Sequence, residues 1–205
     1  MTRVAARASS SKRDASPRAW QRMLSGRRLD LLDPSPLDIE IEDIAHGLAR
    51  VARWNGQTTG AHAFSVAQHS LLVERIAGDL KPLLNRGQRL MALLHDAPEY
   101  VIGDLISPFK AAVGLDYKAF ENRLLAAIHL RFGLSAKAPR EAAALVKQAD
   151  HIAAYFEATQ LAGFSQAEAK RFFGDPKGFA PIKLKPLSVT EAQERYLKRF
   201  RALAG

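Results

Sequence analysis

The chain has 205 residues, 47% of them hydrophobic, which suits a single domain with a full core. It contains no cysteine, so disulfides and thiolate metal sites are excluded. No apolar run reaches the roughly 18 to 20 residues of a membrane span, and the N-terminus lacks the apolar core of a secretory signal. We therefore expect a cytoplasmic protein.

The net charge of +9 is concentrated near the N-terminus. Residues 1–28 hold eight arginines and lysines against one aspartate, so the rest of the chain carries only +2. The Ser-, Ala- and Arg-rich residues 1–18 cannot bury enough apolar surface to order themselves. We predict a flexible basic tail there and a single domain at 19–205. The tail could contact RNA or an anionic surface, but a solvated tail without a nucleic-acid partner is favoured.

Helical patterns dominate the remaining sequence, so the predicted fold class is all-α. A turn is expected at Asp33–Pro36, and the alternating Leu37–Ile41 is typical of a short strand or an extended lead-in. Ser65 is expected to cap one helix, and Pro139 to lie in the first turn of another. The loop at 174–178 is rich in Gly and Pro. The predicted helices cover residues 42–53, 64–80, 86–98, 117–132, 139–162 and 189–203.

The pair His95-Asp96 lies inside the apolar stretch 89–99, with His69 upstream and Asp150 downstream. Adjacent residues on a helix point about 100° apart, so this pair can hold an ion in front of its helix. Two further helices would then close the site. Two imidazoles and two carboxylates suit a catalytic divalent ion with open coordination positions. Mn²⁺, Co²⁺, Zn²⁺, Mg²⁺ and Fe²⁺ all remain candidates for this cofactor.

Taken singly, these residues have ordinary structural explanations. A lone histidine such as His69, between apolar neighbours, is usually a core or surface residue. Asp150 also lies in an apolar setting, where a carboxylate is costly to bury unless a cation compensates it. Only the order of both around His95-Asp96 favours the ligand interpretation. The remaining histidines are expected to be structural, although His62 is near enough in sequence to lie close to substrate: His46, His62, His129 and His151.

The order of these residues resembles the HD-domain phosphohydrolase superfamily, and three blocks resemble its bacterial 5′-deoxynucleotidases. The blocks are Arg53-Trp54 with Ser65–Leu71, His95–Glu99 with Gly103–Leu105 and Pro108–Lys110, and Val146–Asp150. The resemblance covers roughly residues 50–162. It implies an HD-domain helical bundle with a metal site between helices, and hydrolysis of a small nucleotide. We also expect a homo-oligomer, most simply a dimer, without membrane contact.

Glu99 is the predicted catalytic residue. It lies four residues after His95 and three after Asp96, on the same face of a helix that Pro98 is expected to end or bend. Glutamate here is typical of the resembled 5′-deoxynucleotidases, whereas many other HD enzymes carry lysine. Glu99 would orient or deprotonate a water, or protonate the leaving oxygen. The alternative is a solvated acid at the helix end.

Four residues are predicted to bind substrate. Arg53 offers a planar fork for phosphate, and Trp54 a flat face for a base or sugar. Asp104 can accept a hydrogen bond from a sugar hydroxyl, which in the resembled family bears on the choice of deoxyribose. Lys110 would add charge near phosphate, although an ordinary surface lysine is an equally good interpretation.

The sequence departs from the deoxynucleotidase pattern at several places. Gln68 replaces the usual glutamate before the first histidine, the segment between Asp96 and Asp150 is shorter, and the loop at 55–63 is longer. Residues 25–46 also resemble bacterial and phage HD proteins, some of which are similar to dATP-cleaving triphosphohydrolases. The expected function is a 5′-deoxynucleotidase acting on monophosphates. The alternatives are a dNTP triphosphohydrolase and a non-catalytic nucleotide- or RNA-binding HD protein, against which Glu99 and the full ligand set argue.

Overall fold

The computed structural model describes residues 19–105, 117–180 and 182–205. The predicted tail at 1–18 and the predicted phosphate contact Lys110 lie outside these ranges. The helices are α1 (Ile41–Leu48), α2 (Val66–Leu80), α3 (Arg86–Leu93), α4 (Glu99–Ile102), α6 (Tyr117–Arg131), α7 (Arg140–Gln160), α8 (Gln166–Phe173) and α9 (Val189–Ala204). The all-α prediction is confirmed. None of the described helices has both the length and the hydropathy of a membrane span.

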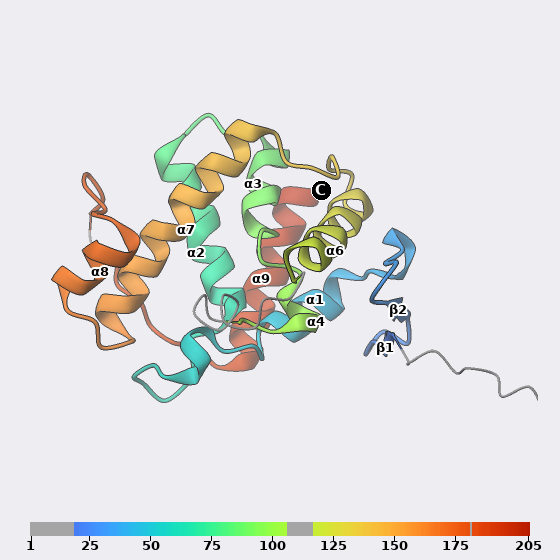
Figure 1. Cartoon of the computed structure of the whole chain (residues 1–205), viewed down its shortest axis with the longest axis horizontal. Helices are drawn as coiled ribbons and strands as arrows, with labels where there is room; N and C mark the ends of the chain where they lie inside the picture. Colours follow the sequence, from blue (N-terminus) through green and yellow to red (C-terminus); the bar gives the residue numbers. More distant parts are fainter. Residues whose placement is uncertain (1–18, 106–116, 181) are drawn as a thin grey trace, which may run out of the picture.

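Helix α2 is the centre of the bundle. It packs against α7 on one side and against α3 and α9 on the other, and α8 packs on α7 (Figure 1). One buried cluster fills the space among α1, α3, α6 and α9, where Tyr196 is fully buried and donates its hydroxyl to the carbonyl of Leu93 at 3.2 Å. A second cluster joins α2, α7 and α8. The face of α2 between the two clusters is where the predicted ligand His69 lies.

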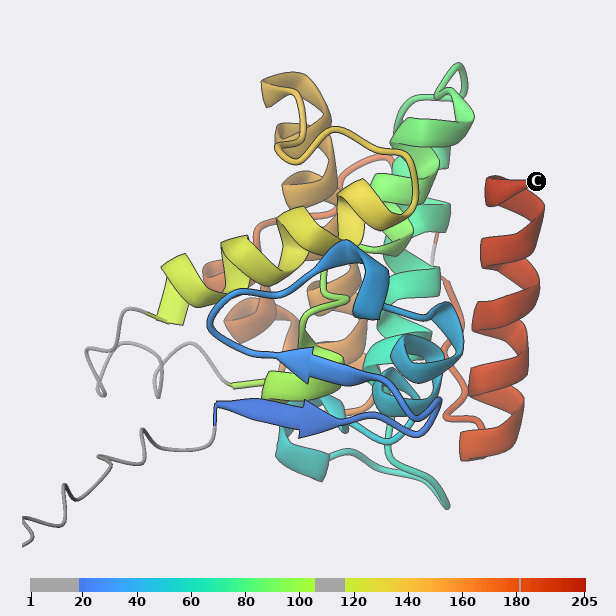
Figure 2. The same cartoon turned by 90° about the vertical axis from the view of Figure 1, so that its right-hand side faces the viewer.

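Two short strands, which the sequence patterns did not predict, form a hairpin before α1. Strands β1 (Trp20–Arg22) and β2 (Arg28–Asp30) pair antiparallel, and Figure 2 shows the hairpin against the side of the bundle. Leu29 is fully buried and joins the first cluster. The stretch after the predicted turn is a 3₁₀ turn at Pro36–Asp38, followed by extended residues at 39 and 40, so it is a lead-in and not a strand.

An ion cluster around the buried Glu74, here called the Glu74 cluster, ties three helices together. The carboxylate of Glu74 on α2 accepts from Arg89 on α3 at 2.7 Å and from Arg199 on α9 at 2.6 and 2.9 Å. Gly78, one turn further along α2, leaves room for the Arg89 guanidinium. A side chain at position 78 would clash with it. Both oxygens of Glu74 are therefore satisfied by protein donors.

Two predicted helices end earlier than expected, and two helices, α4 and α8, were missed. Helix α1 stops at Leu48 instead of residue 53, because the backbone of 51–53 pairs with 64–66. Helix α3 stops at Leu93 instead of residue 98, and residues 94–99 form successive tighter turns with hydrogen bonds between residues three apart. Helix α8 begins with a capping box between Ser165 and Glu168, a sequence signal that predicts a helix start.

The expected caps hold in part. Ser65 accepts from the backbone N–H of Gln68, as predicted. Pro139 is the residue that precedes α7 and not a member of its first turn. The last helix is capped by Ser188, whose side chain accepts from Glu191. These local rules determine where α2 and α7 begin, and hence where their inward faces present side chains.

Candidate metal centre

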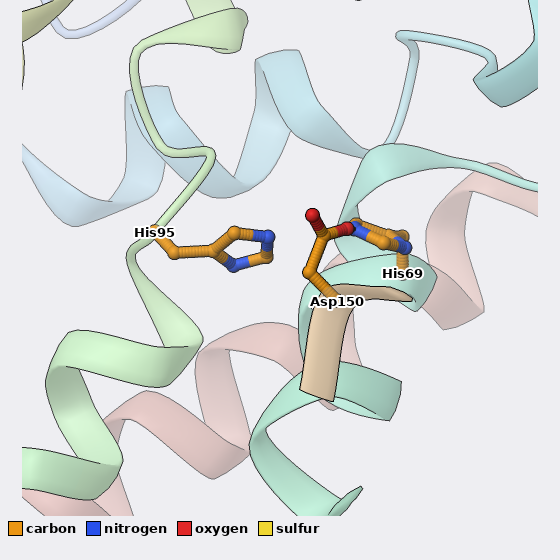
Figure 3. Close-up of side chains that lie close together, drawn as sticks. All are labelled: His69, His95 and Asp150. Atoms are coloured by element: carbon orange, nitrogen blue, oxygen red, sulfur yellow. The ribbon is translucent and has the colours of Figure 1, made fainter. Parts of the chain in front are cut away.

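Three different elements bring the predicted ligands together. His69 comes from α2, His95 from the turn after α3, and Asp150 from α7, and their side chains point toward a common space (Figure 3). One donor atom from each lies within 4.8 Å of the others. The fourth residue, Asp96, places Oδ2 3.1 Å from Nε2 of His95 and 3.4 Å from Nε2 of His69.

Three of the distances between these atoms match those around a single divalent ion. Nε2 of His69 lies 3.3 Å from Oδ1 of Asp150, close to its distance from Asp96. Two donor atoms that are each about 2.1 Å from a common ion, at angles of roughly 90 to 110°, lie about 3.0 to 3.4 Å apart. The Nε2 atoms of His69 and His95 are buried, and neither makes a hydrogen bond within the described residues. Two buried imidazole lone pairs beside two carboxylates are therefore suited to holding a metal.

His95 and Asp96 lie in a turn and not on a helix, which corrects the predicted geometry. The carbonyl of Ala92 can only accept, so Nδ1 of His95 donates to it at 2.9 Å and leaves Nε2 as the acceptor. On a helix the two side chains would point about 100° apart. In this turn they instead contact each other. Both still face the same ion position.

The two carboxylates among the candidate ligands are held in their charged form. Burial raises the pKa of Asp96, but the neighbouring His95 and His69 outweigh burial and keep the pKa well below its ordinary value. Burial likewise raises the pKa of Asp150, and interactions with His69 lower it further than burial raises it. Lys147, one turn earlier on α7, also contacts Asp150, at 3.0 Å. Anionic ligands are what a divalent cation requires.

Glu157 is a residue of this centre that sequence reasoning missed. It is fully buried, and its Oε1 lies 2.6 Å from Nδ1 of His69. It follows Asp150 by seven residues, two turns of α7, so both side chains share one helix face. An acid two turns after a candidate ligand, inside an apolar stretch, was the available signal. Burial and Arg53 lower the pKa of His69, but Glu157 and the other nearby acids raise it well above its ordinary value, so this pocket favours positive charge.

Arg53 and Asp104 lie side by side next to this cluster. Nη1 of Arg53 donates to Oδ2 of Asp104 at 2.9 Å, and Nε lies 3.3 Å from Oε2 of Glu157. Their side chains are only 14% and 7% exposed. Burial lowers the pKa of Arg53, but the charges of Glu157, Asp104, Asp96 and Glu99 raise it above its ordinary value. Arg53, which is predicted to contact phosphate, is therefore always positively charged and lies among acidic side chains.

The sequence did not indicate the environment of Trp54. Trp54 and Asn55 adopt left-handed backbone conformations, with φ of 57° and 51°, within the turn Arg53–Gly56. The indole N–H donates to Oε2 of Glu157 at 2.9 Å, and the ring packs against Phe164 and Phe173 at centroid distances of 5.5 and 5.7 Å. Its role as a face for a base or sugar remains a prediction.

Glu99 is buried, at 3% exposure, as the first residue of α4. This burial contradicts the alternative of a solvated acid at a helix end. Gly47 on α1 lies so close to Tyr100 that a Cβ there would be 2.7 Å from the Tyr100 Cβ, which fixes α4 against α1. Glu99 therefore has a defined place one turn after Asp96, and its catalytic role remains a prediction.

Gln68, which replaces the glutamate of the family pattern, has a structural explanation. Its Nε2 donates to the carbonyl of Lys185 and its Oε1 accepts from the N–H of Leu187, both at 3.0 Å. Only an amide can donate and accept in this way, because an ionised carboxylate has no proton to donate. Gln68 thus fixes the segment before α9 to α2, beside the candidate ligand His69.

Residues 43–173 match the family described as 5′-deoxynucleotidase YfbR-like. The chain is also 62% identical over 195 residues to an uncharacterized protein of Rhodobacter capsulatus, in a match that covers 92% of this chain and 99% of the relative. The matched family region contains all four candidate ligands together with Glu99 and the paired Arg53 and Asp104. Since the match spans well over half of the chain and includes this centre, the chain belongs to the YfbR-like 5′-deoxynucleotidase family of the HD superfamily.

Proposed function

We propose that the protein is a divalent-metal-dependent 5′-deoxynucleotidase that releases phosphate from deoxynucleoside 5′-monophosphates. The observation that carries the proposal is the convergence of two buried imidazole Nε2 atoms and two ionised carboxylates at ligand spacing. Membership of the family supports hydrolysis of a nucleotide phosphate ester. The metal's identity is left open.

The ligands would be His69, His95, Asp96 and Asp150. A bound divalent ion supplies a Lewis acid for phosphate oxygens and lowers the pKa of a bound water. Glu99, buried one turn after Asp96, would orient or deprotonate that water, or return a proton to the leaving sugar oxygen. Its burial keeps competing water away from this proton transfer.

Arg53 would bind the phosphate. Its guanidinium is already held by Asp104 and Glu157, so little side-chain freedom is lost when a phosphate joins it. Asp104 would accept a hydrogen bond from the deoxyribose, and Trp54 would border the nucleoside. Lys110 stays a predicted phosphate contact outside the described residues.

The monophosphate is favoured by family membership, because the matched family is described as 5′-deoxynucleotidase YfbR-like. Charge does not separate the two substrates, since Lys147 and Arg53 are already paired with Asp150, Asp104 and Glu157. We therefore propose the monophosphatase over the triphosphohydrolase, and the substrate panel decides between them.

The test is a substrate panel with the purified protein loaded with Mn²⁺, Co²⁺, Zn²⁺ or Mg²⁺. Deoxynucleoside monophosphates, ribonucleoside monophosphates and dNTPs are offered separately, and products are resolved by chromatography. We expect inorganic phosphate and deoxynucleoside from the first group. Tripolyphosphate from dNTPs, or no turnover of any nucleotide with any metal, would contradict the proposal. The expected dimer is checked by light scattering on the same samples.

A further inference from the structure

Glu157 contacts two parts of the site, His69 and the Arg53–Gly56 turn, which lie about 90 to 100 residues before it in the chain. Oε1 faces the imidazole of His69, and Oε2 accepts from both Arg53 and Trp54. All three partners offer N–H groups, so both oxygens must accept. A fully buried group that needs two acceptor oxygens has to be a carboxylate.

The contact with His69 selects one form of the imidazole. When Nδ1–H donates to Oε1 of Glu157, the lone pair of the neutral ring lies on Nε2. Nε2 is the atom that faces Asp96 and Asp150. In the opposite tautomer, Nε2 would direct an N–H at the ion position, and Nδ1 would have no proton to donate to Glu157.

The contact with Arg53 and Trp54 holds a backbone that is uncommon for residues with side chains. Left-handed conformations at Trp54 and the following Asn55 persist only where the surroundings fix them. The hydrogen bond from the indole to Glu157 and the packing on Phe164 and Phe173 supply that restraint. The direction of Arg53, the first residue of this turn, depends on the same restraint.

We propose that Glu157 is a positioning residue that couples metal binding at His69 to the conformation of the Arg53–Gly56 turn. It presents Nε2 of His69 to the ion through one oxygen and fixes the phosphate-binding side of the site through the other. This inference rests on the proposed metal-dependent function. Binding of metal then steadies the turn that receives the phosphate, and the coupling acts in both directions.

Glu157→Gln tests the coupling with almost no change of shape. The amide keeps one acceptor oxygen, so its NH₂ must face either the His69 N–H or the donors of Arg53 and Trp54. The matched control is Glu74→Gln, which makes the same change in another buried carboxylate with arginine partners, five residues from His69 on α2. Mn²⁺ affinity is measured by isothermal titration calorimetry for both variants and the unaltered protein.

We expect Glu157→Gln to weaken Mn²⁺ binding by about 10- to 100-fold, as loss of a carboxylate behind a ligand histidine does elsewhere. Glu74→Gln should lower the melting temperature and leave the affinity unchanged. Equal affinities for all three proteins, or equal losses in both variants, would overturn the role of Glu157 while leaving the proposed function intact. An unaltered protein that binds no divalent ion would instead overturn the proposed function.

Two further measurements use the unaltered protein, so they test the proposal even if the Glu157→Gln variant fails to fold. Hydrogen exchange of a peptide spanning residues 52–60 should slow on addition of Mn²⁺ to the unaltered protein; unchanged exchange would contradict the coupling. In the Zn²⁺-loaded protein, ¹⁵N chemical shifts of His69 should report a protonated Nδ1 and a metal-bound Nε2. The reverse assignment would exclude the proposed role of Glu157 without any variant.

Discussion

Two buried titratable groups of helix α2, His69 and Glu74, lie five residues apart, and their surroundings differ in charge balance. Glu74 meets two arginines, from α3 and α9, and both of its oxygens accept hydrogen bonds. His69 instead meets Asp96, Asp150 and Glu157. The first cluster is complete without any further ion, whereas the second holds more buried acid than cation.

The difference separates a structural cluster from a binding site. Burying unbalanced charge is costly, so a fold retains it only where a cation compensates it. Each Glu74 oxygen has a donor, while Nε2 of both His69 and His95 has none within the described residues. We infer that Glu74, with its two arginine partners, supports stability, and that the acids around His69 support metal binding and catalysis. Substitutions in the two clusters should therefore give opposite phenotypes.

The largest effect is expected from the ligands. Asp96→Ala or His95→Ala should abolish stoichiometric metal and nucleotide hydrolysis, since either change removes one of four ligands. The helical circular dichroism should persist because neither core cluster includes these side chains. Metal content is measured by plasma mass spectrometry. Full turnover by an Asp96→Ala protein that has lost its metal would end the metal mechanism.

A smaller effect is expected for Glu99→Gln, which keeps the shape of a buried side chain and removes its charge. Metal should stay bound while kcat falls by roughly 10² to 10⁴, the usual contribution of general acid–base catalysis. Steady-state kinetics and metal content are measured on the same preparation. An unchanged kcat would assign Glu99 a structural role, and loss of metal would make it a ligand or a partner of one.

Arg53→Ala should lower kcat/KM for a deoxynucleotide by about 30- to 150-fold, which corresponds to a charged phosphate contact of about 2 to 3 kcal/mol. Deletion of residues 1–18 is the comparison, since it removes several cations that we expect to play no part in catalysis. That deletion should leave kcat/KM nearly unchanged. The opposite pattern would mean that the substrate-binding cations lie in the basic tail.

The smallest effect on activity is expected from the Glu74 cluster. Glu74→Gln should cost about 2 to 3 kcal/mol of unfolding free energy, because charged hydrogen bonds from Arg89 and Arg199 are weakened in a buried setting. For a chain of this length that lowers the melting temperature by roughly 4 to 12 °C. Calorimetry measures the shift. A fall in kcat without loss of stability would break the contrast between the two clusters.

Much of the candidate site could be predicted because its signals are local in sequence. The adjacent His95-Asp96, and acids and histidines in apolar stretches, mark residues whose burial needs a cation. Six of the helices were found from apolar spacing, and Ser65 from its capping pattern. The predicted ends of α1 and α3 were wrong. Helix α1 ends early because residues 51–53 pair with 64–66, and α3 ends early because tight turns follow Leu93. Both features depend on contacts that the spacing of apolar residues does not encode.

The parts that escaped prediction depend on distant contacts. Glu157 becomes recognisable only when α7 lies on α2 and its carboxylate meets His69 and Trp54. The left-handed Trp54 and Asn55 contradict local preference and are held by residues about a hundred positions later. Gln68 reads as a departure from the family until its two backbone partners before α9 are seen.

The most direct test of the central claim is anomalous diffraction from crystals soaked in Mn²⁺. We expect one peak, about 2.0 to 2.3 Å from Nε2 of His69, Nε2 of His95 and carboxylate oxygens of Asp96 and Asp150. The Glu74 cluster in the same crystal should show none. A soaked crystal without a peak among these four residues, or with its metal bound elsewhere, would rule out the proposed metal site.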